Sequence, residues 1–170
     1  MTGRLKTLTT TFGAAAALVA TIILEPLPLY IWNVSASVPI GLYRLRPADR
    51  FHVTELVAIH PPEPLAVFLD LNGYLPVGVP MLKRVLALPG QTVCRSGLTI
   101  SVDAIEMGEA RDRDGRGRPL PSWQGCRVVG EGELFLMNWQ SDDSLDGRYF
   151  GLFPASAVIG RALPVWTGEE

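Results

Sequence analysis

Apolar positions form one continuous run near the start of the chain and short runs after it. Residues 7–24 are 18 successive positions without a charged side chain. As a helix, this run would be about 27 Å long, close to the thickness of a bilayer's hydrocarbon core. Arg4 and Lys6 precede it, so the positive-inside bias keeps the N-terminus in the cytoplasm and exports the rest. The pattern predicts one transmembrane helix within residues 1–32.

A signal peptide that is cleaved after export is the main alternative for this segment. Cleavage requires small residues at the end of the apolar stretch. The stretch instead ends in Leu24-Glu25-Pro26, and its alanines lie earlier, at 14–17. We therefore expect an uncleaved anchor. A buried helix of a soluble domain is less compatible with a run that no polar face interrupts.

Beyond residue 32, short apolar runs alternate with turns that contain Gly and Pro, a pattern typical of β-strands. The predicted strands are 41–46, 56–59, 65–69, 81–88, 92–94, 98–102, 133–137 and 158–163. Asn72-Gly73 indicates a hairpin turn. No later segment has an apolar helical stripe long enough to compete. We expect a mainly β domain over residues 33–170, coiled into a barrel.

Composition and charge restrict the class of function. Hydrophobic residues make up 48% of the chain and charged residues 19%, so the chain can bury a core. The net charge of -2 argues against a basic face for nucleic acid. The Asp- and Arg-rich residues 110–121 are interpreted as an exposed turn and not as a calcium loop. With no Gly-rich phosphate loop and no metal-spaced His/Glu cluster in the sequence, we expect no cofactor, no metal and no nucleic-acid partner.

The two cysteines, Cys94 and Cys126, lie on either side of that turn. Thiols of an exported domain tend to oxidise, which favours a disulfide between them. Two unpaired buried cysteines are the alternative.

Two segments place polar side chains in a setting suited to chemistry. In residues 35–41, Ser35 and Ser37 precede a proline, although such serines usually form only a turn. In residues 81–90, Lys83 lies inside an apolar strand. Burying an ammonium group is costly unless it becomes neutral, and a neutral lysine can act as a general base. The alternative for this lysine is a side chain that reaches water from a strand edge.

A third segment, residues 138–151, has the pattern of a polar loop with an Asp146–Arg148 ion pair. In order and spacing, the three segments resemble the Ser-x-Ser-Met-x-Pro, lysine and Ser-x-Asp-Ser-Arg boxes of the type I signal peptidases, which are serine proteases with a Ser/Lys dyad. The stretches 37–43, 117–127 and 150–166 look like those of the conjugative-transfer (TraF-type) branch. Two departures are Val38 in place of Met, with one residue missing before the proline, and Gly147 in place of Ser.

The resemblance implies a role for each matched residue. Ser37 would be the nucleophile and Lys83 the base that takes its proton. The main-chain N–H of Ser37 and the hydroxyl of Ser35 would form the oxyanion hole. The supporting residues would be Ser144, which orients the lysine, and the ion pair of Asp146 and Arg148. Whether Asp146 is catalytic or structural stays open.

The resemblance also implies a location and a substrate. The catalytic domain would lie in the bacterial periplasm, anchored to the inner membrane by a single helix. Its substrate would be a conjugative pilin precursor with small residues before the cut, joined into a ring in some members. A general type I signal peptidase that cuts many preproteins is one alternative. A non-catalytic, membrane-anchored scaffold of the transfer apparatus is another.

Overall fold

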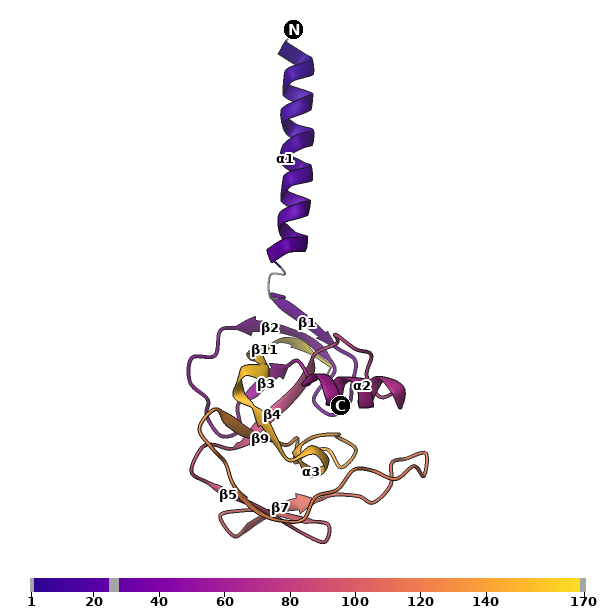
Figure 1. The fold of residues 1–170 in the computed structure, drawn as a ribbon, viewed down its shortest axis with the longest axis vertical. Helices are drawn as coiled ribbons and strands as arrows, with labels where there is room; N and C mark the ends of the chain where they lie inside the picture. The colour runs from indigo at the N-terminus through magenta and orange to yellow at the C-terminus, as the bar shows by residue number, and fades with distance from the viewer. Residues whose placement is uncertain (1, 25–27, 169–170) are drawn as a thin grey trace.

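A long N-terminal helix precedes a β-rich body in the computed structural model, which describes residues 2–24 and 28–168 (Figure 1). The helix, α1 (Thr2–Leu24), extends away from the strands. Four of its threonine hydroxyls, at positions 7 and 9–11, donate to carbonyls one turn earlier, as from Thr10 to Lys6 at 2.8 Å. Among the described residues, no helix combines the length and the apolar character that a membrane crossing requires. The predicted transmembrane helix is therefore not confirmed, since Thr, Gly and Ala occupy much of α1.

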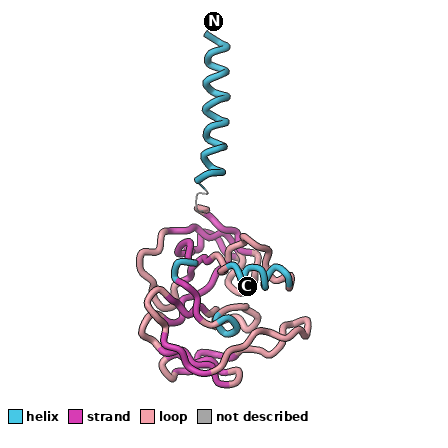
Figure 2. Tube along the Cα trace, in the orientation of Figure 1, coloured by secondary structure: helices cyan, strands magenta, loops and turns pink. Residues whose placement is uncertain are grey.

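Over residues 28–168, eleven strands form two antiparallel sheets; the strands are drawn in magenta in Figure 2. The larger sheet contains, in spatial order, β1 (Tyr30–Asn33), β2 (Gly41–Arg46), β11 (Val158–Thr167), β3 (Leu56–Ile59), β4 (Met81–Ala87), β9 (Glu133–Leu136) and β10 (Leu152–Pro154). The smaller sheet contains β7 (Ile105–Glu109), β6 (Thr99–Val102), β5 (Thr92–Ser96) and β8 (Gly125–Val128). The expectation of a mainly β domain is confirmed.

The expected barrel is wrong. Strands β1 and β10 end the larger sheet, and over residues 28–168 no pairing joins these two edges. The smaller sheet likewise has two edges of its own, β7 and β8. Apolar periodicity predicts where strands lie and which face they bury, but closure depends on whether the end strands meet.

The segment predicted as a strand over 65–69 is instead helical, within α2 (Glu63–Leu71). Leu65, Phe68 and Leu69 follow the i, i+3, i+4 spacing that brings side chains to one helix face, and they pack on the core. A proline in the first turn favours helix initiation. Asn72 is the C-cap of this helix, so the predicted hairpin turn is also wrong.

Most other predicted strands match observed ones within a few residues. The sequence patterns did not predict four strands, β1, β7, β8 and β10, or the short helix α3 (Gly147–Phe150).

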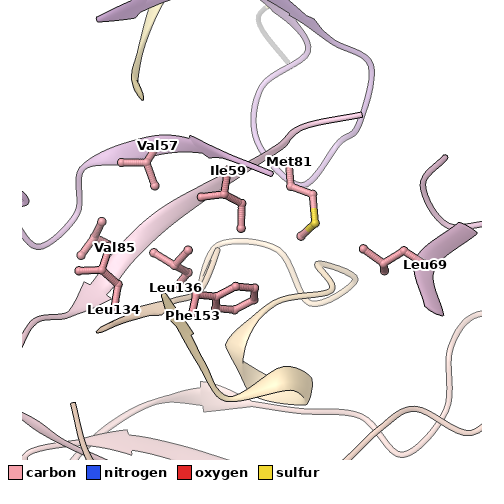
Figure 3. Close-up of a cluster of buried hydrophobic side chains, with 8 residues drawn as sticks. All are labelled: Val57, Ile59, Leu69, Met81, Val85, Leu134, Leu136 and Phe153. Atoms are coloured by element: carbon pink, nitrogen blue, oxygen red, sulfur yellow. The ribbon is translucent and has the colours of Figure 1, made fainter. Parts of the chain in front are cut away.

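Strand β4 lies at the centre of the domain, between apolar clusters. One apolar cluster comes from α2 and four strands (Figure 3): Val57, Ile59, Leu69, Met81, Val85, Leu134, Leu136 and Phe153. A second cluster, which includes Leu86, Val93 and Phe135, joins β4 and β9 to the smaller sheet. Since apolar layers cover β4 on both faces and its neighbours β3 and β9 pair with it, its backbone is held firmly.

The smaller sheet contains the disulfide. Cys94 on β5 lies directly opposite Cys126 on β8, and the two sulfurs are bonded. The two cysteines are 32 positions apart in sequence, and the largely exposed turn at 110–121 lies between them. Such a closure restricts the unfolded chain and stabilises the fold by roughly 3–4 kcal/mol on the chain-entropy model.

Replacing both cysteines, as Cys94→Ala with Cys126→Ala, should lower the free energy of unfolding by about 3 kcal/mol, because the unfolded chain regains its freedom. Denaturant unfolding with and without reductant measures this, and the double variant should show no response to reductant. Thiol titration of the denatured wild type should find no free thiol before reduction. Two free thiols per chain would contradict the disulfide.

Candidate active site

The three polar segments meet at one cleft of about 230 Å³. Ser35 and Ser37 come from the turn after β1, Lys83 from the middle of β4, and Ser144 from the loop before α3. Apolar side chains form much of the remaining wall: Leu69, Leu75, Met81, Leu82 and Leu145. The fold thus brings together polar groups that are far apart in sequence, inside an apolar surround.

Lys83 is buried within the sheet, with 4% of its surface exposed. It lies opposite Val57 of β3, and its Nζ donates a hydrogen bond to Ser144 Oγ at 2.7 Å. Burial lowers the pKa of Lys83 from 10.5 to about 8; the nearby Asp146 carboxylate opposes this shift and Arg148 adds to it. Desolvation is the dominant cause, since water no longer solvates the ammonium form. The amine is therefore neutral in an appreciable fraction of molecules near neutral pH.

The loop that carries Ser144 is fixed by a buried ion pair. Arg148 Nε lies 3.0 Å from Asp146 Oδ1, and both side chains are almost fully buried. Arg148 also donates to the carbonyls of Ser141 at 2.6 Å and Ser144 at 3.1 Å. Asp146 caps α3 by accepting the Arg148 N–H and also accepts the Asn138 N–H. These contacts hold the loop close to Lys83.

The two serines of the first turn are hydrogen-bonded to each other. Ser35 Oγ donates to Ser37 Oγ at 3.1 Å and accepts the Ser37 N–H at 3.3 Å. Within residues 28–168, no hydrogen bond joins Ser37 to Lys83. For the lysine to take the serine's proton, Ser37 Oγ has to come within hydrogen-bond distance of the amine.

Two buried asparagines, for which the sequence motifs predicted no role, flank these groups. Asn138 donates to the Leu82 carbonyl at 3.1 Å and accepts the Arg84 N–H at 2.9 Å, so it holds the backbone on both sides of Lys83. Asn33 contacts the serine turn in a similar way. One sequence signal could have indicated such residues: an amide side chain directly after an apolar run, as Asn138 follows Phe135–Met137.

The turn at 110–121 is organised by its own side chains. Asp114 accepts hydrogen bonds from Tyr74 Oη at 2.6 Å and from Arg118 Nε at 2.7 Å. Its pKa is well below the usual range, chiefly because of the Tyr74 hydrogen bond. Over the described part of the chain, no group of three or more His, Cys, Asp and Glu side chains is placed to hold a metal ion.

Comparisons with known proteins agree with one another. The family model described as "Signal peptidase, peptidase S26" matches residues 2–167. A "Probable conjugal transfer protein TraF" of Sinorhizobium fredii is 36% identical over 148 residues, covering 81% of this chain and 77% of the relative. A "Plasmid transfer protein TraF" of Escherichia coli is 34% identical over 146 residues, covering 79% and 81%. A "Probable signal peptidase I-1" of Synechocystis is 32% identical over 111 residues, covering 65% and 52%.

The family match extends over nearly the whole chain, from α1 to the end of β11, and includes every segment that lines the cleft. The relatives named TraF match it over most of their own length as well. This protein therefore belongs to the signal peptidase family, peptidase S26.

Proposed function

We propose that this protein is a serine endopeptidase in which Ser37 is the nucleophile and Lys83 the general base. The observation that carries the proposal is the buried amine of Lys83, with a pKa lowered to about 8, in the same cleft as Ser37. A lysine held in this way can accept a proton near neutral pH, which an exposed lysine cannot do.

The reaction would proceed through an acyl-enzyme. The neutral amine of Lys83 takes the proton of Ser37 Oγ as this oxygen attacks the peptide carbonyl carbon. The Ser37 N–H and the Ser35 hydroxyl donate to the developing oxyanion, a contribution of roughly 3–4 kcal/mol per well-placed donor. The lysine then gives its proton to the leaving amine, and the C–N bond breaks. Water, activated by Lys83, attacks the ester and releases Ser37.

Ser144 and the ion pair would support this chemistry without touching the substrate. The Ser144 hydroxyl accepts from Lys83 Nζ and so directs the amine. Asp146 and Arg148 hold the Ser144 loop in place. In this proposal Asp146 is a structural residue, because its carboxylate is engaged by Arg148 and by the Asn138 N–H.

The proposed substrate is the precursor of a conjugative pilin with small residues one and three positions before the cut. The leucines that line the cleft favour small apolar side chains over charged ones. The conjugative role is supported by the names of the TraF relatives. If an amine of the same precursor attacked the acyl-enzyme in place of water, the product would be a ring.

We also propose that residues 1–32 attach the catalytic domain, residues 33–170, to the outer face of the inner membrane. Residues 7–24 carry no charge, and apolar side chains of α1 such as Leu8 and Phe12 are exposed. The threonine hydroxyls are already hydrogen-bonded within the helix, which lowers the cost of transferring them to lipid.

Ser37→Ala and Lys83→Met should each reduce cleavage of a pilin-like precursor with an Ala-x-Ala site by at least about 10³-fold, since either change removes the nucleophile or its base. Detergent-solubilised protein and mass spectrometry measure this. Hydrolysed and ring-closed products differ by the mass of one water.

Two matched variants control this experiment. Ser101→Ala removes a hydroxyl on β6, outside the cleft, and Arg84→Met removes the positive charge next to Lys83 in β4. Both should retain cleavage within a few-fold of wild type, and circular dichroism should show all four variants folded. Full activity of Lys83→Met would contradict the proposed base.

The value of kcat/KM should increase with pH and reach half of its maximum near pH 8, because only the neutral form of Lys83 accepts a proton. At pH 7, about one tenth of the lysine would be neutral, so the rate should be about tenfold below its plateau. A pH series of initial rates between 6 and 9.5 measures this. A flat profile across this range would exclude a titrating base of this pKa.

The full chain should sediment with membranes and resist alkaline extraction. A double charge substitution in α1, Ala16→Asp with Val19→Asp, should release it, since each carboxylate costs roughly 2.5–3.5 kcal/mol at the centre of a bilayer. Ala16→Leu is the matched control and should stay in the membrane. Recovery of the wild-type chain in the soluble fraction would contradict the anchor.

A further inference from the structure

One buried side chain, that of Asn33, holds the turn that carries the two serines. Asn33 is the last residue of β1 and lies opposite Gly41 in β2. Its Nδ2 lies within hydrogen-bond distance of three carbonyl oxygens: Ser35 at 2.7 Å, Val38 at 3.1 Å and Pro39 at 3.1 Å. Its Oδ1 accepts the Ser35 N–H at 3.1 Å. A single amide thus contacts the turn from residue 35 to residue 39.

Few other contacts hold the part of the turn that carries the two serines. Ser35 and Ala36 are exposed, so packing does not fix them. The far end of the turn is anchored separately, because Val38 is buried and Tyr43 Oη donates to the Pro39 carbonyl at 2.6 Å. Asn33 is therefore the contact that ties the exposed part of the turn to the sheet.

Lys83, the other member of the proposed dyad, is held in place independently of the serine turn. Lys83 lies in a central strand, and Asn138 holds the backbone on both of its sides. Since β4 is fixed on both faces, the distance between the nucleophile and the base depends on the serine turn. A displacement of about 1 Å in such an arrangement can cost on the order of 10²-fold in rate.

We infer that Asn33 is a positioning residue for the reaction: its amide fixes the backbone of the turn, so that Ser37 Oγ, the Ser37 N–H and the Ser35 hydroxyl face the cleft in register with Lys83. The inference rests on the proposed Ser/Lys mechanism. Asn33 does not touch the reacting atoms and takes no proton.

Kinetics of Asn33→Ala and Asn33→Asp test this role. Asn33→Asp retains the acceptor for the Ser35 N–H but replaces the Nδ2 donor, which serves three carbonyls. Both variants should lower kcat by about 10- to 100-fold and leave KM within about threefold, because the turn aligns the nucleophile and not the substrate. The midpoint of the pH profile should stay near 8, since Lys83 is undisturbed.

Asn72→Ala is the matched control. Asn72 also donates to a main-chain carbonyl, that of Phe68 at 2.8 Å, but it does not line the cleft. Its kcat should equal that of wild type. Wild-type kcat in Asn33→Ala would overturn the inference, and so would a loss in Asn33→Ala that simply follows its melting temperature. Equal turnover by wild type and Ser37→Ala would instead contradict the proposed mechanism itself.

Hydrogen exchange of the wild-type chain keeps the inference testable if both Asn33 variants fail to fold. The Ser35 amide, although it belongs to an exposed residue, should exchange at least tenfold more slowly than an unstructured amide, because it donates to Asn33 Oδ1. Exchange of this amide at the unstructured rate would show that Asn33 does not hold the turn and would overturn the inference.

Discussion

The burial of one primary amine is the constraint on which the rest of this structure depends. Lys83 sits in a central strand, out of water, with Ser144 as its hydrogen-bond partner. The opposite charge that acts on the amine, that of Asp146, is already paired with Arg148, and the two charges shift the pKa of Lys83 in opposite directions. Desolvation therefore decides the pKa. The sheet, the loop before α3 and the apolar clusters together exclude water from that amine and hold it in position.

The smaller sheet and the segment just before β8 contribute to this arrangement through the backbone of α3. Arg95 on β5 donates to the Arg148 carbonyl at 2.6 Å, and Trp123 Nε1 donates to the Gly147 carbonyl at 2.9 Å. Burial lowers the pKa of the Arg95 guanidinium. Both contacts hold the backbone of the helix that follows the Ser144 loop. Arg95 belongs to the smaller sheet and Trp123 lies two residues before β8, so the disulfide between β5 and β8 stabilises the part of the fold that provides both donors.

Local patterns along the sequence predicted the strands well, but long-range geometry less well. Residues 41–46 and 56–59 matched β2 and β3, because alternation, or a short apolar run between turns, favours a strand without excluding a helix. The run 65–69 became helical, since five apolar residues fit a helix face as well as a strand. The motif residues were found by resemblance to a family. No role was predicted for Asn33 or Asn138, because their hydrogen bonds reach main-chain atoms, which no side-chain pattern records.

Lys83 also differs from the other basic side chains of the domain in kind. Between residues 28 and 168, Lys83 is the single lysine, and all the remaining members of the Lys/Arg set are arginines. A guanidinium keeps its proton at any pH that a folded protein meets, so the ion pairs of Arg118 and Arg148 persist across the range in which the lysine titrates. The titration of the amine and the charge of the ion pairs therefore depend on different side chains. In the proposed mechanism, protonation would switch the Lys83 amine off while the arginines keep their charge, so a change in external acidity would regulate the domain without breaking its ion pairs.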